Sequence, residues 1–149
     1  MRLLLAVCLL TILPALAMAQ SAGLSGSALE RANAERQERG LPPLGTDPRL
    51  ARAAEEQAAH MARVGRMTHR GPRGEDIMRR VRGAGFRSCF AAENVAFGQP
   101  DGNAVTTAWM GSASHRRNIL DKRASVAAVA GARRADGVIY WAMILAAPC

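Results

Sequence analysis

Apolar residues recur at helical spacing in the middle of the chain and form continuous runs near its end. Four of them fall on one stripe of a single helix: Leu50, Ala54, Met61 and Val64. Asp47 and Pro48 precede this stripe as the usual N-cap and first helical residue, and Gly65 follows it as the usual stop. The pattern therefore predicts a helix from Asp47-Pro48 to Gly65.

Three further helices are predicted. Ser27 and Glu30 form a capping box for a helix that ends before Gly40. Residues 75–82 are acidic at their start and basic at their end, as the helix dipole favours. Asn103 is the expected cap of the last helix, in which four residues share a face: Val105, Ala108, Trp109 and Ser112.

The final part of the chain predicts strands. Residues 125–134 and 138–147 are apolar runs, and the turn sequence Ala135-Asp136-Gly137 between them is typical of a β-hairpin. Helices that precede strands, with no internal repeat, indicate an α+β domain in which helices pack on a small antiparallel sheet.

The N-terminal residues have the pattern of a secretory signal peptide. Arg2 precedes an apolar run that is broken at Pro14, and Ala17-Met18-Ala19 is a typical cleavage site. The run is too short for a membrane-spanning helix. We therefore expect a signal peptide at residues 1–19, a flexible leader at 20–27 and one domain at 28–149. The mature protein would be secreted or periplasmic, monomeric and not an integral membrane protein.

The chain is basic, with a formal net charge of +8 over 149 residues. Such a charge invites a nucleic-acid partner, but export and the small number of aromatic residues argue against one. Exposed arginines favour a solvated surface, and attraction to anionic cell-envelope components is the alternative. The basic clusters are Arg79-Arg80-Arg82-Arg87, Arg116-Arg117-Lys122-Arg123 and Arg133-Arg134.

Removal of a signal peptide would leave two cysteines, Cys89 and Cys149. An even number of cysteines in an exported protein predicts a disulfide bond. We expect this bond to fasten the end of the chain to the middle of the domain.

Three histidines and one carboxylate are the candidates for chemistry. His60 lies at the border of the apolar stripe of its helix, so no special role is expected for it. His69 follows a helix end, His115 follows Ser112-Ala113-Ser114, and Glu93 stands beside Asn94 in an otherwise apolar segment. A carboxylate in such surroundings needs a partner. Two imidazoles and a carboxylate suit zinc, but their spacing in the sequence does not make them converge.

Several short motifs, in order, resemble the CAP superfamily, which includes cysteine-rich secretory proteins, venom antigens and class 1 pathogenesis-related proteins of plants. The similarity is closest to the bacterial secreted branch. The motifs are Ala32-Asn33-Ala34-Glu35-Arg36, Gly40-Leu41-Pro42-Pro43-Leu44, Asp47-Pro48-Arg49-Leu50, Met61, His69, Gly85-Phe86, Ala92-Glu93-Asn94-Val95-Ala96 with Gly98, Trp109-Met110, Ser114-His115-Arg116, Asn118-Ile119-Leu120 and Tyr140-Trp141.

The resemblance implies an α-β-α sandwich and a cleft in which His69, Glu93 and His115 meet, in the place where plant and animal members often hold a divalent metal. Those members have a second glutamate and a strand histidine that this sequence lacks, so at most three of the four ligands are present. Asn94 belongs to the same cleft, and Glu93 serves either a ligand or the surrounding backbone.

The sequence therefore favours a secreted, non-catalytic binding module that holds a small molecule, a lipid or a divalent metal such as zinc in this cleft. One alternative is a metal-dependent extracellular hydrolase in which Glu93 activates a metal-bound water. The other is an envelope interaction protein that acts through its arginine-rich surface.

Overall fold

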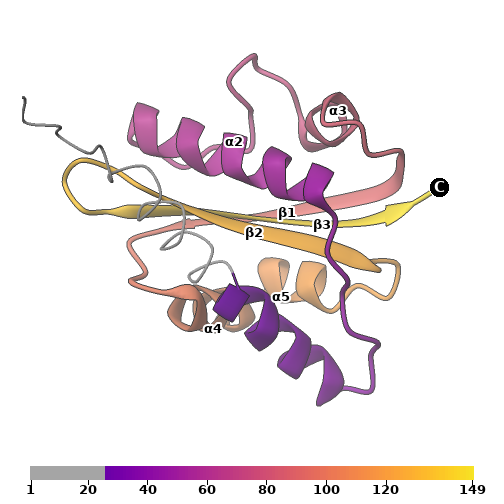
Figure 1. Ribbon diagram of the computed structural model, residues 1–149. Helices are drawn as coiled ribbons and strands as arrows, with labels where there is room; N and C mark the ends of the chain where they lie inside the picture. Colours follow the sequence, from indigo (N-terminus) through magenta and orange to yellow (C-terminus); the bar gives the residue numbers. More distant parts are fainter. Residues whose placement is uncertain (1–25) are drawn as a thin grey trace, which may run out of the picture.

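In the computed structural model, which describes residues 26–149, helices cover both faces of one three-stranded sheet (Figure 1). The predicted α+β class and the sandwich implied by the resemblance are confirmed. The elements are an N-terminal helix (residues 26–37), α2 (Pro48–Val64), α3 (Ile77–Gly83), β1 (Ser88–Phe97), α4 (Gly102–Gly111), α5 (Ala113–Ile119), β2 (Val126–Arg133) and β3 (Ile139–Pro148).

The sheet is antiparallel, with the strand order β1-β3-β2. Strands β2 and β3 form the predicted hairpin, and its turn contains Gly137 at φ 88°, a conformation that favours glycine. Strand β1 was not predicted. It lies at one edge of the sheet and pairs with β3 from Phe97↔Tyr140 to Ser88↔Pro148, so its partner lies far away in the sequence.

Strand β3 is buried on both faces and divides the core into two halves. Tyr140, Ala142 and Ile144 belong to the half beneath α2 and α3. Trp141 and Met143 belong to the other half, together with Trp109 of α4. The aromatic side chains of Trp109, Tyr140 and Trp141 are all buried in this core.

The ends of α2 are as predicted. The Asp47 side chain accepts a hydrogen bond from the Arg49 amide at 2.8 Å, Pro48 is the first helical residue, and Gly65 ends the helix in the left-handed conformation. Gly65 is at φ 68°, where other residues are strained.

Other predicted helix ends were wrong. Asp101, not Asn103, caps α4, because its side chain accepts a hydrogen bond from the Ala104 amide at 2.8 Å. Residue 26 is already helical, so Ser27 lies inside the first helix rather than at its N-cap. Asp76 caps α3, so that helix begins after Glu75. His115 lies in a separate helix, α5, instead of at the end of α4.

Arg36 of the N-terminal helix is fully buried, and its side chain bonds to the main chain. Its guanidinium donates to four main-chain carbonyl oxygens at 2.8–3.2 Å, those of Pro42, Ile119, Asp121 and Ala124. One side chain therefore connects the first helix to the loop before α2 and to the segment after α5.

The predicted disulfide bond between Cys89 and Cys149 is present, with the two Cα atoms 4.8 Å apart. It joins the start of the edge strand β1 to the last residue of the chain. The predicted signal peptide and its cleavage site lie outside the described residues. Within residues 26–149, no helix is both long enough and apolar enough to cross a membrane.

Candidate functional site

His69 lies in the loop between α2 and α3, which the buried Gln57 holds against α2. The Gln57 amide donates to the Thr68 carbonyl oxygen at 2.5 Å. The imidazole of His69 is 63% exposed, but its Nδ1 atom is 2.8 Å from Oε1 of Glu93. One ring nitrogen is thus fixed from inside the protein while most of the ring faces solvent.

Glu93 of β1 is the buried partner of His69. Its side chain is 2% exposed, and its second oxygen, Oε2, accepts a hydrogen bond from Nη2 of Arg80 on α3. Arg80 is completely buried. Glu93 therefore has the partner that the sequence analysis expected, and in fact it has two: the buried guanidinium of Arg80 and the exposed imidazole of His69.

Arg80 was missed as a site residue because it lies in a run of arginines that indicates a solvated surface. Arg79 and Arg82, its neighbours on α3, are exposed as that interpretation expects. The available signal was Glu93 itself, since a buried carboxylate is stabilised only when charged or hydrogen-bonding groups surround it.

His115 approaches β1 from the opposite side of the sheet. Successive side chains of a strand point to opposite faces, so Glu93 faces α3 while Asn94 faces α5. The Asn94 amide donates to the His115 carbonyl oxygen at 3.1 Å, and Asn118 donates to Asn94 Oδ1 at 2.8 Å. Asn94 therefore positions the main chain of α5, and its polar atoms are used in doing so.

Electrostatics distinguish the two imidazoles. The hydrogen bond that His69 donates to Glu93 raises the pKa of His69, although burial and the charge of Arg80 oppose this shift. The pKa of His115 is lowered, first by burial and then by the nearby charge of His69. The surroundings thus favour the charged form of His69 and the neutral form of His115. We call Glu93, Arg80, His69 and His115 the histidine site.

Glu93 is not free to bind a divalent metal in this arrangement. Both oxygens of Glu93 are occupied, one by His69 and the other by Arg80. Arg80 also has two buried nitrogens, Nε and Nη1, that make no hydrogen bond to the residues described. The carboxylate of the site therefore faces a buried positive charge with spare donors and has no free oxygen for a metal, which leaves only the imidazole nitrogens as ligands. Over residues 26–149, no group of three or more His, Cys, Asp or Glu side chains is arranged to hold a metal ion.

The described residues also show no assembled nucleophile beside either imidazole. Ser112 and Ser114 precede His115 in the sequence, but their hydroxyls are 3.3 Å from each other, with no hydrogen bond to a histidine. Nucleophilic catalysis needs a base within hydrogen-bonding reach of the hydroxyl. His60 is separate from the histidine site, because its Nδ1 atom contacts Arg63 on the same helix at 3.1 Å.

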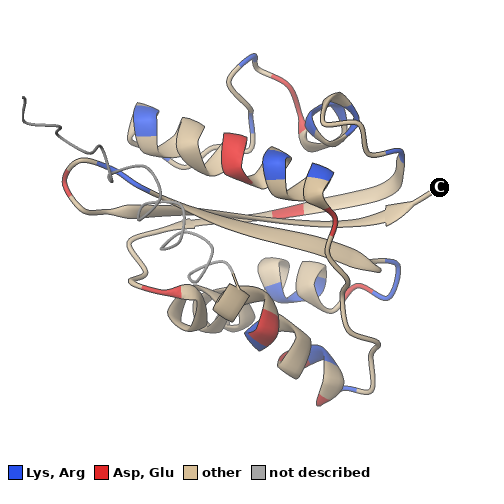
Figure 2. Ribbon diagram, viewed as in Figure 1, with Lys and Arg blue, Asp and Glu red and all other residues tan. Residues whose placement is uncertain are grey.

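The arginines are distributed over much of the molecule (Figure 2). Several form local pairs, such as Arg49 with Asp47 at 2.6 Å and Arg123 with Asp121 at 2.7 Å. Arg36 and Arg80 are buried and have internal roles. The basic sequence clusters therefore do not add up to one continuous charged face.

The chain is thus an α-β-α domain in which an edge strand lies between two helical layers and has a histidine on each side. The family model "CAP: Cysteine-rich secretory protein family" matches residues 29–145, so the chain belongs to the CAP family. The resemblance seen in the motifs is thereby confirmed.

Relatives and solved structures agree with this assignment. The uncharacterised protein YkwD of Bacillus subtilis is 36% identical over 93 residues, which are 62% of this chain and 36% of that protein. The chain thus spans about a third of the length of this curated relative. An extracellular protein of Bacillus anthracis with an SCP domain superposes with a TM-score of 0.81 at 21% identity, over 91% of this chain and 44% of that one.

Two further structures share the fold. An outer surface protein of Borrelia burgdorferi gives a TM-score of 0.75 at 20% identity, covering 81% of this chain and 90% of that one. A cysteine-rich secretory protein of Staphylococcus aureus gives 0.64 at 23% identity, covering 85% and 39%. At these identities the similarity establishes the fold, and a ligand must be argued from the residues themselves.

Proposed function

We propose that this protein is an exported CAP-domain binding module that holds an acidic small molecule or lipid at the histidine site without chemical turnover. The observation that carries the proposal is the bridge formed by Glu93 between the buried Arg80 and the exposed His69. Export is supported by the signal-peptide pattern of residues 1–19 and by relatives described as extracellular or outer-surface proteins.

The bridge fixes the chemistry that His69 offers. An ionised Glu93 accepts a hydrogen bond from the Nδ1 proton of His69, so Nε2 is the nitrogen available to a ligand. The raised pKa of His69 favours a proton on Nε2 as well, which makes this nitrogen a charged donor. A carboxylate or phosphate group is the matching acceptor.

His115 complements this donor. Its lowered pKa favours the neutral ring, which offers one donor and one acceptor and adds no charge. A hydrogen bond to a charged group contributes about 1.5–3 kcal/mol. Loss of the His69 contact should therefore weaken binding of an acidic ligand by roughly 10- to 100-fold.

The test has two parts. Mass spectrometry of the protein purified without chelator identifies any ligand that is carried through purification. NMR titration with hexanoate and, separately, inorganic phosphate then follows the imidazole signals below the pKa of His69. We expect a saturable shift of the His69 signal that is lost in His69→Gln and kept in the matched control His60→Gln. A protein that carries no ligand and shows no saturable shift with either anion contradicts the proposal.

The same samples test the metal-dependent hydrolase predicted as an alternative. Its requirement is stoichiometric zinc, bound at neutral pH and lost in both His69→Gln and His115→Gln. Metal analysis and zinc titration measure this directly. Because a metal binds the deprotonated imidazole, zinc binding would also lower the apparent pKa of the His69 ring, whereas binding of an anion would not.

A further inference from the structure

The exposed large apolar side chains among the described residues gather at one end of the molecule. They are Val64, Met67 and Phe97, which are 45%, 46% and 50% exposed. Val64 is the last residue of α2, and Phe97 ends β1, where its ring stacks on Tyr140 with the ring centres 5.7 Å apart. The Gly98 amide donates to the Ile139 carbonyl oxygen at 2.9 Å, which places this end of β1 beside the β2–β3 hairpin.

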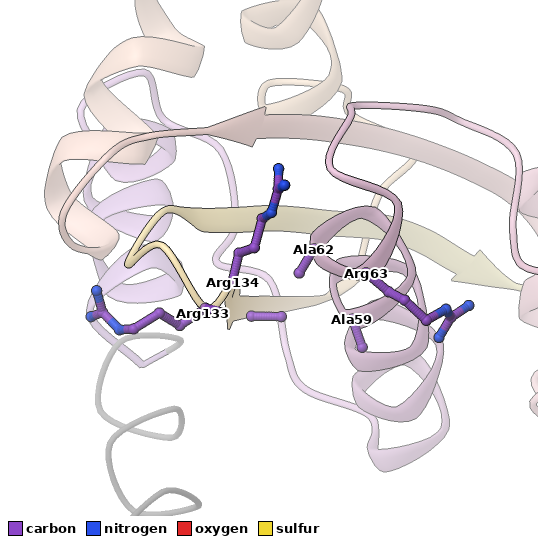
Figure 3. Close-up of a pocket in the computed structure, with 7 residues that line it drawn as sticks. Ala59, Ala62, Arg63, Arg133 and Arg134 are labelled. Atoms are coloured by element: carbon purple, nitrogen blue, oxygen red, sulfur yellow. The ribbon is translucent and has the colours of Figure 1, made fainter.

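Three arginines surround a hollow at the same end. The hollow has a volume of about 450 Å³ and lies between the last turns of α2 and the hairpin, with alanines from both elements in its wall. In Figure 3, Arg63, Arg133 and Arg134 leave this wall in different directions. Arg134 also lies over Gly65, where a Cβ atom would be only 2.5 Å from its Nη1 atom. The end of α2 and the hairpin are thus held together beneath the arginines.

Negative charge is sparse on this part of the surface. The hairpin carries one carboxylate, Asp136, whose Oδ2 atom is 3.6 Å from Nε of Arg134. Figure 2 shows basic positions at the end of α2 and on the hairpin, with acidic colour at the hairpin turn. Positive charges therefore outnumber negative ones beside the exposed apolar side chains.

We propose that this hairpin end, defined by Val64, Met67, Phe97, Arg63, Arg133 and Arg134, is a docking surface for a lipid bilayer that contains anionic phospholipid. A single phosphate would be bound best by converging guanidiniums, whereas these diverge and match negative charges spread over a surface. Apolar side chains beside basic ones suit an anionic membrane. The apolar side chains enter the boundary of the acyl chains, and the basic side chains stay at the anionic headgroups.

The proposal is independent of the histidine site, which depends on other residues. A basic side chain near an anionic membrane contributes about 1 kcal/mol, which corresponds to roughly a fivefold change in affinity. Loss of three arginines should therefore weaken vesicle binding on the order of 100-fold. Because the attraction is electrostatic, it should decline as salt is added.

The experiment is co-sedimentation of the exported protein with vesicles of phosphatidylcholine, either alone or mixed with phosphatidylglycerol. The test variant is R63Q/R133Q/R134Q. The matched control, R79Q/R82Q/R117Q, removes the same charge from exposed positions on α3 and α5. We expect binding to the mixed vesicles only, lost in the test variant and retained by the control. R63K/R133K/R134K should retain it as well, since charge is kept.

A Phe97→Trp variant reports on the apolar part of the surface. The native tryptophans, Trp109 and Trp141, are buried, so the additional fluorescence of this variant comes from the new, exposed indole. Its emission maximum should shift to shorter wavelength when the protein binds mixed vesicles. Equal loss of binding in the test and control variants would mean attraction by net charge alone and would overturn the proposal. Binding that is unaffected by the test variant, or by high salt, would overturn it as well. His69→Gln should bind vesicles normally, so failure of the ligand proposal leaves this one standing.

Discussion

Arg80→Met is the substitution that tests the histidine site most directly. It removes the buried guanidinium while leaving a side chain of similar length in the core, and Glu93 then remains buried with His69 as its only charged partner. Removal of one member of a buried ion pair typically costs 3–5 kcal/mol, because the remaining charge is not compensated. Since His69 still contacts Glu93, we expect a loss of about 3 kcal/mol, near the lower limit.

The measurement is urea unfolding at neutral pH, with the denaturant slope compared between variants to confirm that the same surface is exposed. The double variant R80M/E93L provides the control, because it removes both charges. An apolar pair in place of a buried ion pair is often neutral or stabilising, so the double variant should recover most of the loss. If Arg80→Met costs less than about 1 kcal/mol, or if the double variant is the less stable of the two, the buried-pair reasoning is refuted.

Three further outcomes are expected. Arg36→Met should lower the free energy of unfolding by at least about 3 kcal/mol, because buried carbonyls lose charged donors. The control Arg117→Gln, at an exposed position, should change it by less than about 0.5 kcal/mol. Equal midpoints of urea unfolding for the two variants would contradict this. Cys149→Ala removes the disulfide bond to Cys89, which closes a loop of about 60 residues, and should lower the free energy of unfolding by at most about 4 kcal/mol. A reductant should destabilise the native protein but leave this variant unchanged. The pKa of His69 is raised on folding, so its stabilisation is present below the unfolded pKa and is lost as pH rises through the folded one; His69→Gln should remove that fall from a plot of stability against pH.

Helix α2 and the C-terminal hairpin could be predicted from the sequence, because they depend on local signals. Asp47, Pro48 and Gly65 mark α2 on their own, and the hairpin turn stands between two apolar runs. The cap of α4 was wrong by two residues, since Asp101 and not Asn103 begins that helix. Both types of residue cap helices well, so the choice depends on where the backbone turns.

Strand β1 was missed for a different reason. Its apolar run is interrupted by Glu93 and Asn94, so it shows neither clean alternation nor a continuous apolar stretch. Its partner β3 lies about 40 residues or more further along the chain, and no turn signal connects the two. Pairing over such a distance depends on the assembled core, which no local pattern describes.

Recognition of β1 as an edge strand explains how His69 and His115 come to lie on the two sides of one strand, although nothing in their spacing predicts it. Two consecutive residues of this strand necessarily face opposite layers. Glu93 holds the side chain of His69 on the α3 side, and Asn94 holds the main chain of His115 on the α5 side. A one-residue shift of β1 along β3 would exchange the faces of Glu93 and Asn94. The Cys89–Cys149 bond joins these two strands at the end of the ladder and thereby opposes such a shift, so the disulfide bond protects the geometry of the histidine site as well as the stability of the fold.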